Sequence, residues 1–124
     1  MKYENIPPIP RADAQRILSA GPADRLATAV LAVALHENDL DFAQDYCLRA
    51  TGARDPLVRG NAVLGLGHLA RRFGRLDQNK VEPIVAWALL DDDQYIRGQA
   101  EAAADDIQHF TTWRVRRSSR RADA

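Results

Sequence analysis

The sequence is poor in several features on which other small proteins depend. It has one cysteine, Cys47, among 124 residues, and only 6% of its residues are aromatic. No internal disulfide can therefore form, which favours a reducing compartment. No apolar run approaches the roughly 20 residues of a membrane span, and the first ten residues lack the apolar stretch of a signal peptide. These absences predict a cytoplasmic protein that does not enter a membrane.

The apolar residues that are present, 46% of the chain, are mainly alanine, leucine and valine. This composition favours closely packed helices over a β-sandwich, which would need more threonine, tyrosine and β-branched residues in alternation. A chain of this length is expected to form one domain. Apolar spacing and turn residues predict six helices, at about residues 11–19, 22–36, 39–51, 56–73, 79–90 and 94–110.

Two segments that lie 38 positions apart are the most informative pattern in the chain. Residues 55–62 read DPLVRGNA, and residues 93–100 read DQYIRGQA. The acid that opens each segment is expected to cap the following helix, and the arginine is expected to reach the acid or the carbonyl groups of an adjacent turn. A repeat of this period is typical of stacked helical arrays, whose product is usually a binding surface.

The same two segments resemble the HEAT-repeat family of armadillo-like α-solenoids. In that family an Asp-containing turn precedes a Val-Arg or Ile-Arg pair, then a small residue and an apolar one. The likeness covers residues 39–110 and is weak for residues 11–37. It implies an all-α protein, a short right-handed HEAT-like solenoid of five or six helices in antiparallel pairs. Residues 1–113 would form this domain, and residues 114–124 a basic tail.

The family resemblance also implies which residues face a partner. In HEAT repeats the second helix of each pair lines a concave face, where partners often bind. Off their buried stripes, these two helices would present Asn61, Leu64, His68 and Arg72, and Gln99, Ala102, Asp106 and His109.

The zero net charge of the chain conceals an uneven distribution. Residues 114–124 hold five arginines against one acid, so the remaining 113 residues sum to −4. The acidic run at residues 91–93 lacks the ligand spacing of a calcium loop, and we interpret it as a helix cap. Glu101 and Asp105 lie four residues apart and repel each other on one helical face. A basic partner would relieve this repulsion, although an ordinary solvated face remains the alternative.

Residues that could carry out catalysis do not form a recognisable set. His36, His68 and His109 fall in three separate helices, and Cys47 lies on the apolar stripe of its own helix. The sequence has no Cys-pair metal motif and no glycine-rich phosphate loop. We therefore predict a binding protein without a cofactor or a metal, and not an enzyme.

A free-standing HEAT-like protein of this size is similar to the immunity proteins of bacterial contact-dependent growth inhibition systems. Those proteins neutralise a toxin domain, often a nuclease, that a neighbouring cell delivers. The resemblance implies a protein partner, and the acidic body of the chain is compatible with the basic cleft of a nuclease. The prominent acids argue against nucleic acid as the partner. The predicted contact residues are Asp91, Asp92, Asp93, Tyr95, Glu101, Asp105, Asp106, Asn61, His68, Arg72 and Trp87.

Two alternatives remain open at this point. The arginine-rich tail, with Trp113 beside it, is compatible with nucleic-acid binding. The chain could also be a scaffold or a maturation factor, similar to other HEAT-repeat proteins. The sequence alone does not distinguish these functions.

Overall fold

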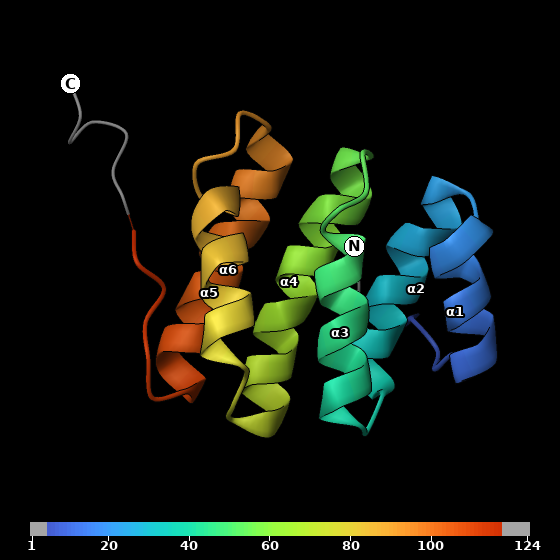
Figure 1. The fold of residues 1–124 in the computed structure, drawn as a ribbon, viewed down its shortest axis with the longest axis horizontal. Helices are drawn as coiled ribbons and strands as arrows, with labels where there is room; N and C mark the ends of the chain where they lie inside the picture. Colours follow the sequence, from blue (N-terminus) through green and yellow to red (C-terminus); the bar gives the residue numbers. More distant parts are fainter. Residues whose placement is uncertain (1–4, 118–124) are drawn as a thin grey trace.

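The computed structural model describes residues 5–117, and these residues form six helices and no strand (Figure 1). The all-α prediction is confirmed for this part of the chain, and each expected helix is present within two residues of its predicted bounds. The helices are α1 (Arg11–Ala20), α2 (Ala23–His36), α3 (Leu40–Ala50), α4 (Pro56–Phe73), α5 (Gln78–Ala88) and α6 (Gln94–Phe110).

The helices are arranged in two layers (Figure 1). One layer contains α2, α4 and α6, with α4 packed between the other two. The second layer contains α1, α3 and α5. α4 is the centre of the core because it packs against α2, α3, α5 and α6. Every residue of α4 from Gly60 to Ala70 is buried.

Glycines on α4 allow α6 to approach it closely. A Cβ at Gly67 would lie 2.8 Å from the backbone Cα of Ala103, and a Cβ at Gly60 would lie 2.5 Å from the ring of Tyr95. Gly98 occupies the same position in the second repeat segment as Gly60 does in the first, but no atom lies within 4 Å of its Cβ position. α6 is the last helix of its layer in the described chain, so no further helix covers Gly98.

Both acids of the repeated segment cap a helix, as predicted. The carboxylate of Asp55 accepts hydrogen bonds from the N–H groups of Leu57 (2.9 Å) and Val58 (3.1 Å) at the start of α4. The carboxylate of Asp93 accepts them from Tyr95 (2.8 Å) and Ile96 (3.1 Å) at the start of α6. Each carboxylate thus satisfies two N–H groups that have no partner within the helix.

We expect Asp55→Ala to lower the free energy of unfolding by about 1–2 kcal/mol, because two donors at the start of the central helix lose their acceptor. Urea denaturation followed by circular dichroism measures the change. Asp45→Ala is the control, since its carboxylate lies exposed on α3 and only pairs with Arg49. That change should cost no more than about 0.5 kcal/mol. Equal effects of the two substitutions would contradict the role of the cap.

The two arginines of the repeated segment both bind the acidic turn, which confirms the predicted contact. Arg59 donates to the carboxylate of Asp91 at 2.8 Å. Arg97 donates to the carbonyl oxygens of Asp91 (2.8 Å) and Asp92 (2.9 Å). The repeat therefore joins the start of α4 and the start of α6 through one turn.

Both ends of the described chain pack on the helices. Ile6 is buried against Leu31 and Leu64, on α2 and α4, and its carbonyl oxygen lies 2.6 Å from Nε2 of His36. At the other end Val115 is buried in the main core, and Trp113 packs partly against it. Residues 5–10 and 111–117 are therefore part of the folded unit.

Candidate functional site

The α4 residues predicted to face a partner lie inside the molecule. Asn61 is 1% exposed and His68 is 5% exposed, and Leu64 is buried as well. The prediction that these three side chains are presented outward is wrong. The physical reason is that neighbouring segments cover this face of α4, since Tyr95 of α6 lies over it at one end and Ile6 covers Leu64.

Asn61 connects the three helices of its layer. Its Nδ2 donates to the carbonyl oxygen of Ala27 on α2 at 3.0 Å, and its Oδ1 accepts from the hydroxyl of Tyr95 on α6. Gln99 in turn donates to the Tyr95 hydroxyl at 2.8 Å. Both Asn61 and Tyr95 therefore have a packing role, and 39% of the Tyr95 side chain remains exposed.

His68 and Arg72 are also used within the fold. Arg71 donates to Nδ1 of His68 at 2.9 Å, so this nitrogen carries no proton. Burial, together with the nearby charges of Arg71 and Arg72, lowers the pKa of His68 to about 4. Arg72 is half-buried and donates to the carbonyl oxygen of Ala34 at 2.8 Å. Arg72 therefore joins α4 to α2, and His68 is neutral at neutral pH.

In the acidic turn at residues 91–93, two of the three carboxylates bind groups of the protein itself. The carboxylate of Asp91 forms an ion pair with Arg59, and its Oδ1 accepts a hydrogen bond from the N–H of Asp93 at 2.8 Å. Asp93 caps α6, which confirms the interpretation of the run as a cap. Asp92 is exposed between them. Among the described residues no group of three His, Cys, Asp or Glu side chains could hold a metal ion.

The basic partner of Glu101 and Asp105 is supplied by the chain itself. Arg117 pairs with both carboxylates, at 2.9 Å from Asp105. The neighbouring N–H of Arg116 donates to Glu82 on α5 at 3.0 Å. Next to this site, burial raises the pKa of Asp106 above its ordinary value, with a smaller contribution from Asp105.

The start of the basic tail is therefore bound to acids of α5 and α6. Glu101 and Asp105 are nevertheless well exposed, at 61% and 77% of their side chains. Two of the arginines that suggested nucleic-acid binding, Arg120 and Arg121, lie outside the described residues.

Trp87 is the most exposed large apolar side chain in the described chain, with 67% of its surface in solvent. It lies in the last turn of α5, just before the acidic turn. Two hollows border it, of about 360 Å³ and about 90 Å³. The sequence predicted Trp87 as a contact residue, but the hollows are lined by five separate segments and have no sequence signature.

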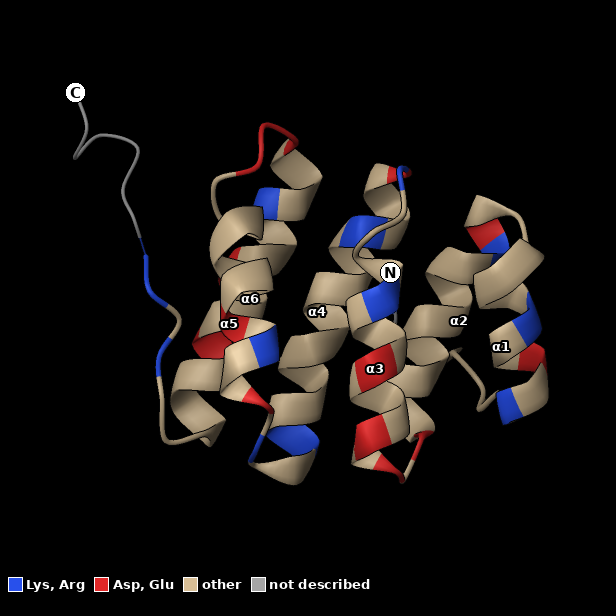
Figure 2. Cartoon of the chain, in the orientation of Figure 1, with Lys and Arg blue, Asp and Glu red and all other residues tan. Residues whose placement is uncertain are grey.

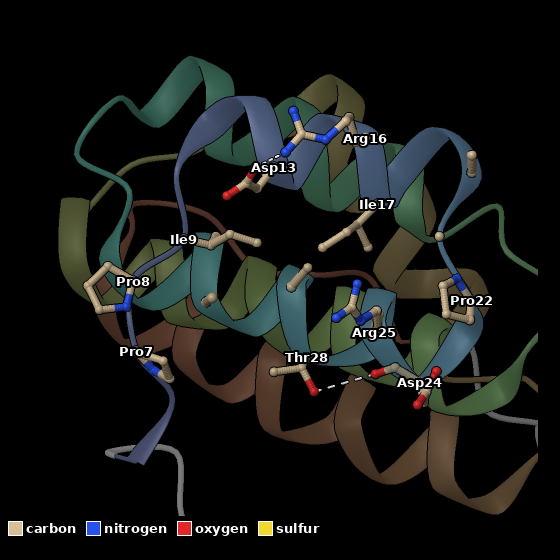
Figure 3. Close-up of a pocket in the computed structure, with 14 residues that line it drawn as sticks. Pro7, Pro8, Ile9, Asp13, Arg16, Ile17, Pro22, Asp24, Arg25 and Thr28 are labelled. Carbon is tan, nitrogen blue, oxygen red and sulfur yellow. Dashed lines mark hydrogen bonds and ion pairs between the residues drawn. The ribbon is translucent and has the colours of Figure 1, made fainter.

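Another hollow is a groove of about 810 Å³ between α1, α2 and the N-terminal segment (Figure 3). Ile9 and Ile17 point into it, and Arg16 pairs with Asp13 on its rim (Figure 3). The groove was not predictable from the sequence, because three segments contribute to it and none of them carries a recognisable motif. Its rim holds charges of both signs, those of Asp13, Arg16, Asp24 and Arg25.

Cys47, the one cysteine of the chain, is not reactive in this arrangement. Cys47 is fully buried, and burial raises the pKa of its thiol to about 12. A thiol with that pKa carries almost no thiolate at neutral pH, so it is not an activated nucleophile.

Within residues 5–117 no helix combines the length and the apolar content needed to span a bilayer.

The formal net charge differs between the N-terminal and the C-terminal parts of the described chain. Residues 5–76 carry nine Lys or Arg and seven Asp or Glu, a formal net charge of +2. Residues 77–117 carry five against eight, a net charge of −3. Figure 2 shows the acidic turn at one end of α5 and α6. The part of the chain that contains Trp87, residues 77–117, is thus acidic.

Comparison with known proteins gives one informative likeness. No protein-family model and no curated protein matches the chain. Its fold is similar to a chain in the crystal structure of a CDI complex from Cupriavidus taiwanensis LMG 19424, with a TM-score of 0.75. The match has 30% sequence identity and covers 89% of this chain and 97% of that chain. Because the identity extends over nearly the whole of both chains, this protein belongs to the same family as that component of the CDI complex.

Proposed function

We propose that this chain is an immunity protein of a contact-dependent growth inhibition (CDI) system, which binds and neutralises a cognate toxin domain. The observation that carries the proposal is the 30% identity, over nearly full length, to a chain of a CDI complex. A chain found in a complex has a protein partner, and no set of groups arranged for catalysis is present in residues 5–117 of this one. The proposed activity is therefore binding and not catalysis.

The charge distribution supports a basic partner. Residues 77–117 have a net charge of −3. Complementary charge speeds the encounter of two proteins. Nucleases present basic surfaces to nucleic acid. A nuclease toxin domain is therefore the partner that we propose, encountered in the cytoplasm.

The two helical layers support a finer description of the fold. We propose that they form a short right-handed HEAT-like solenoid of antiparallel helix pairs. The two segments that begin at Asp55 and Asp93 make equivalent caps, since each carboxylate accepts two N–H groups at the start of its helix. Equivalent contacts at a spacing of 38 residues are expected for stacked repeats.

The test uses the C-terminal domain of the polypeptide encoded immediately upstream of this chain as the probe. We expect a one-to-one complex in about 150 mM salt, measured by light scattering after gel filtration, and restored growth when both proteins are produced in one cell. Absence of a complex and of protection would reject the immunity function. Retention on heparin that depends on residues 114–124 would then favour the nucleic-acid alternative.

Charge reversal at Glu101 and Asp105 should slow association with that probe by about tenfold at low salt, since exposed acids steer a basic partner. Both side chains are exposed, so the double variant is expected to fold. The matched control reverses Asp41 and Asp45, two exposed acids of α3, and changes the net charge equally. Stopped-flow association rates that fall equally in both variants would show that total charge, and not this surface, controls the encounter.

A further inference from the structure

Trp87 stands at the centre of an apolar surface on α5. We define the Trp87 surface as Pro83, Ile84, Ala86, Trp87 and Leu90, which border the two hollows next to the indole. Monomeric proteins seldom leave a tryptophan two-thirds exposed inside an apolar neighbourhood, because exposed apolar area costs free energy in water. The surface therefore has the composition of an interface centre.

Polar groups that are already held in place surround this centre. On one side Arg59 pairs with Asp91 at 2.8 Å, and both residues line the smaller hollow. On the other side Glu82 accepts the N–H of Arg116 at 3.0 Å, and both residues line the larger hollow. A partner that covers Trp87 would meet a rim whose polar groups need little further ordering, which lowers the entropic cost of binding.

Two observations exclude the other predicted aromatic residue and the face of α4 as the centre of the contact. Tyr95 has a structural role, since its ring packs against Gly60 and its hydroxyl donates a hydrogen bond to Asn61. The run from Gly60 to Ala70 on α4 is buried and offers no surface. Trp87 has neither constraint, because most of its side chain is in solvent.

We propose that Trp87 is the central contact for the toxin domain, and that a basic segment of that domain covers the indole and enters the hollows beside it. The surface lies within residues 77–117, whose net charge of −3 favours a cationic occupant. An arginine or lysine side chain can stack on an indole face. A second copy of this chain would place two segments of net charge −3, residues 77–117 of each copy, near each other, which is repulsive. The proposal rests on the immunity function proposed above.

The principal test replaces Trp87 with serine in the full chain. Affinity for the upstream-encoded toxin domain, measured by titration calorimetry, should fall at least about 30-fold, since buried tryptophans dominate interface energetics. The variant should fold, because the side chain that it removes is largely exposed. Unchanged circular dichroism and urea midpoint check this point.

Phe110→Ser is the matched control. Phe110 is an aromatic residue that is 37% exposed at the last position of α6, at the opposite end of that helix from the acidic turn. Its replacement should change the affinity by less than about twofold, as expected for residues outside an interface centre. An equal loss in both variants would show that general surface hydrophobicity, and not Trp87, determines binding.

A second measurement observes Trp87 directly. Trp113→Phe leaves Trp87 as the only tryptophan of this chain. A tryptophan-free version of the toxin domain should then protect its fluorescence from acrylamide and shift its emission to the blue. Unprotected fluorescence in a formed complex would overturn the proposal.

The outcomes separate this proposal from the immunity function. If the wild type binds and Trp87→Ser binds equally well, the Trp87 assignment is wrong and the immunity function stands. If the wild type does not bind the toxin domain, both are wrong. If the chain alone forms a dimer that Trp87→Ser dissociates, as measured by sedimentation, the occupant is a second copy and the toxin contact is wrong.

Discussion

Replacing Gly67 with valine is expected to lower the free energy of unfolding by about 3 kcal/mol, near the upper end for overpacked cores. A Cβ at this position would lie 2.8 Å from the Cα of Ala103 and 3.2 Å from its Cβ. The nearest obstacle is backbone, which cannot rotate away as a long side chain can. α4 and α6 would therefore have to separate, and their contact is the most extensive in the fold. Urea denaturation measures the loss.

Gly98→Ala is the matched control for this prediction. Gly98 also lies inside a helix, but no atom lies within 4 Å of its Cβ position. Alanine should therefore stabilise the protein by about 0.5–1 kcal/mol, through better helix propensity and a less flexible unfolded chain. Opposite signs at the two glycines would show that packing, and not helix propensity, explains Gly67. A stable Gly67→Val variant would contradict the close approach of the helices.

The second large effect is a loss of stability in mild acid that depends on His68. Burial, aided by Arg71 and Arg72, lowers the pKa of this side chain from 6.5 to about 4. Between these values the unfolded state binds a proton that the folded state does not, so stability falls as the pH decreases through this window. The loss between pH 7 and pH 5 should be about 2 kcal/mol, and it should be absent above pH 7.

Urea midpoints measured at pH 7, 6 and 5 test this expectation. His68→Leu removes the titrating group and should flatten the pH dependence, even if the variant is less stable at pH 7 because Arg71 loses its acceptor. A wild type and a His68→Leu variant with the same slope would assign the acid sensitivity to other groups.

The helices were predictable because their signals are local. Asp55 and Pro56 mark the start of α4, and Gly74, the one described residue with positive φ, follows its last residue. A capping carboxylate acts on donors two or three residues away, so its effect is legible in a short stretch of sequence. The repeated segments added one long-range fact, since they predicted that α4 and α6 have equivalent starts.

The partner-facing residues were less predictable because exposure depends on what packs alongside. The periodicity of α4 marks Val58, Leu66 and Leu69 as buried, but it does not indicate that α6 covers Asn61 or that the N-terminal segment covers Leu64. A helix at the centre of a layer is buried on several sides, whereas amphipathic periodicity describes one buried stripe. The sequence therefore overestimated the surface that α4 offers.

By itself, the sequence determined the approximate helix boundaries, the caps, and the contact of the repeated arginines with an adjacent turn. Only the tertiary structure decided that Arg117 meets Glu101 and Asp105, that Tyr95 is committed to Asn61, and that Trp87 is left in solvent between two hollows. The first group depends on interactions within a few residues or on a repeated motif. The second depends on which distant segments become neighbours, and that follows from the packing of all the helices together.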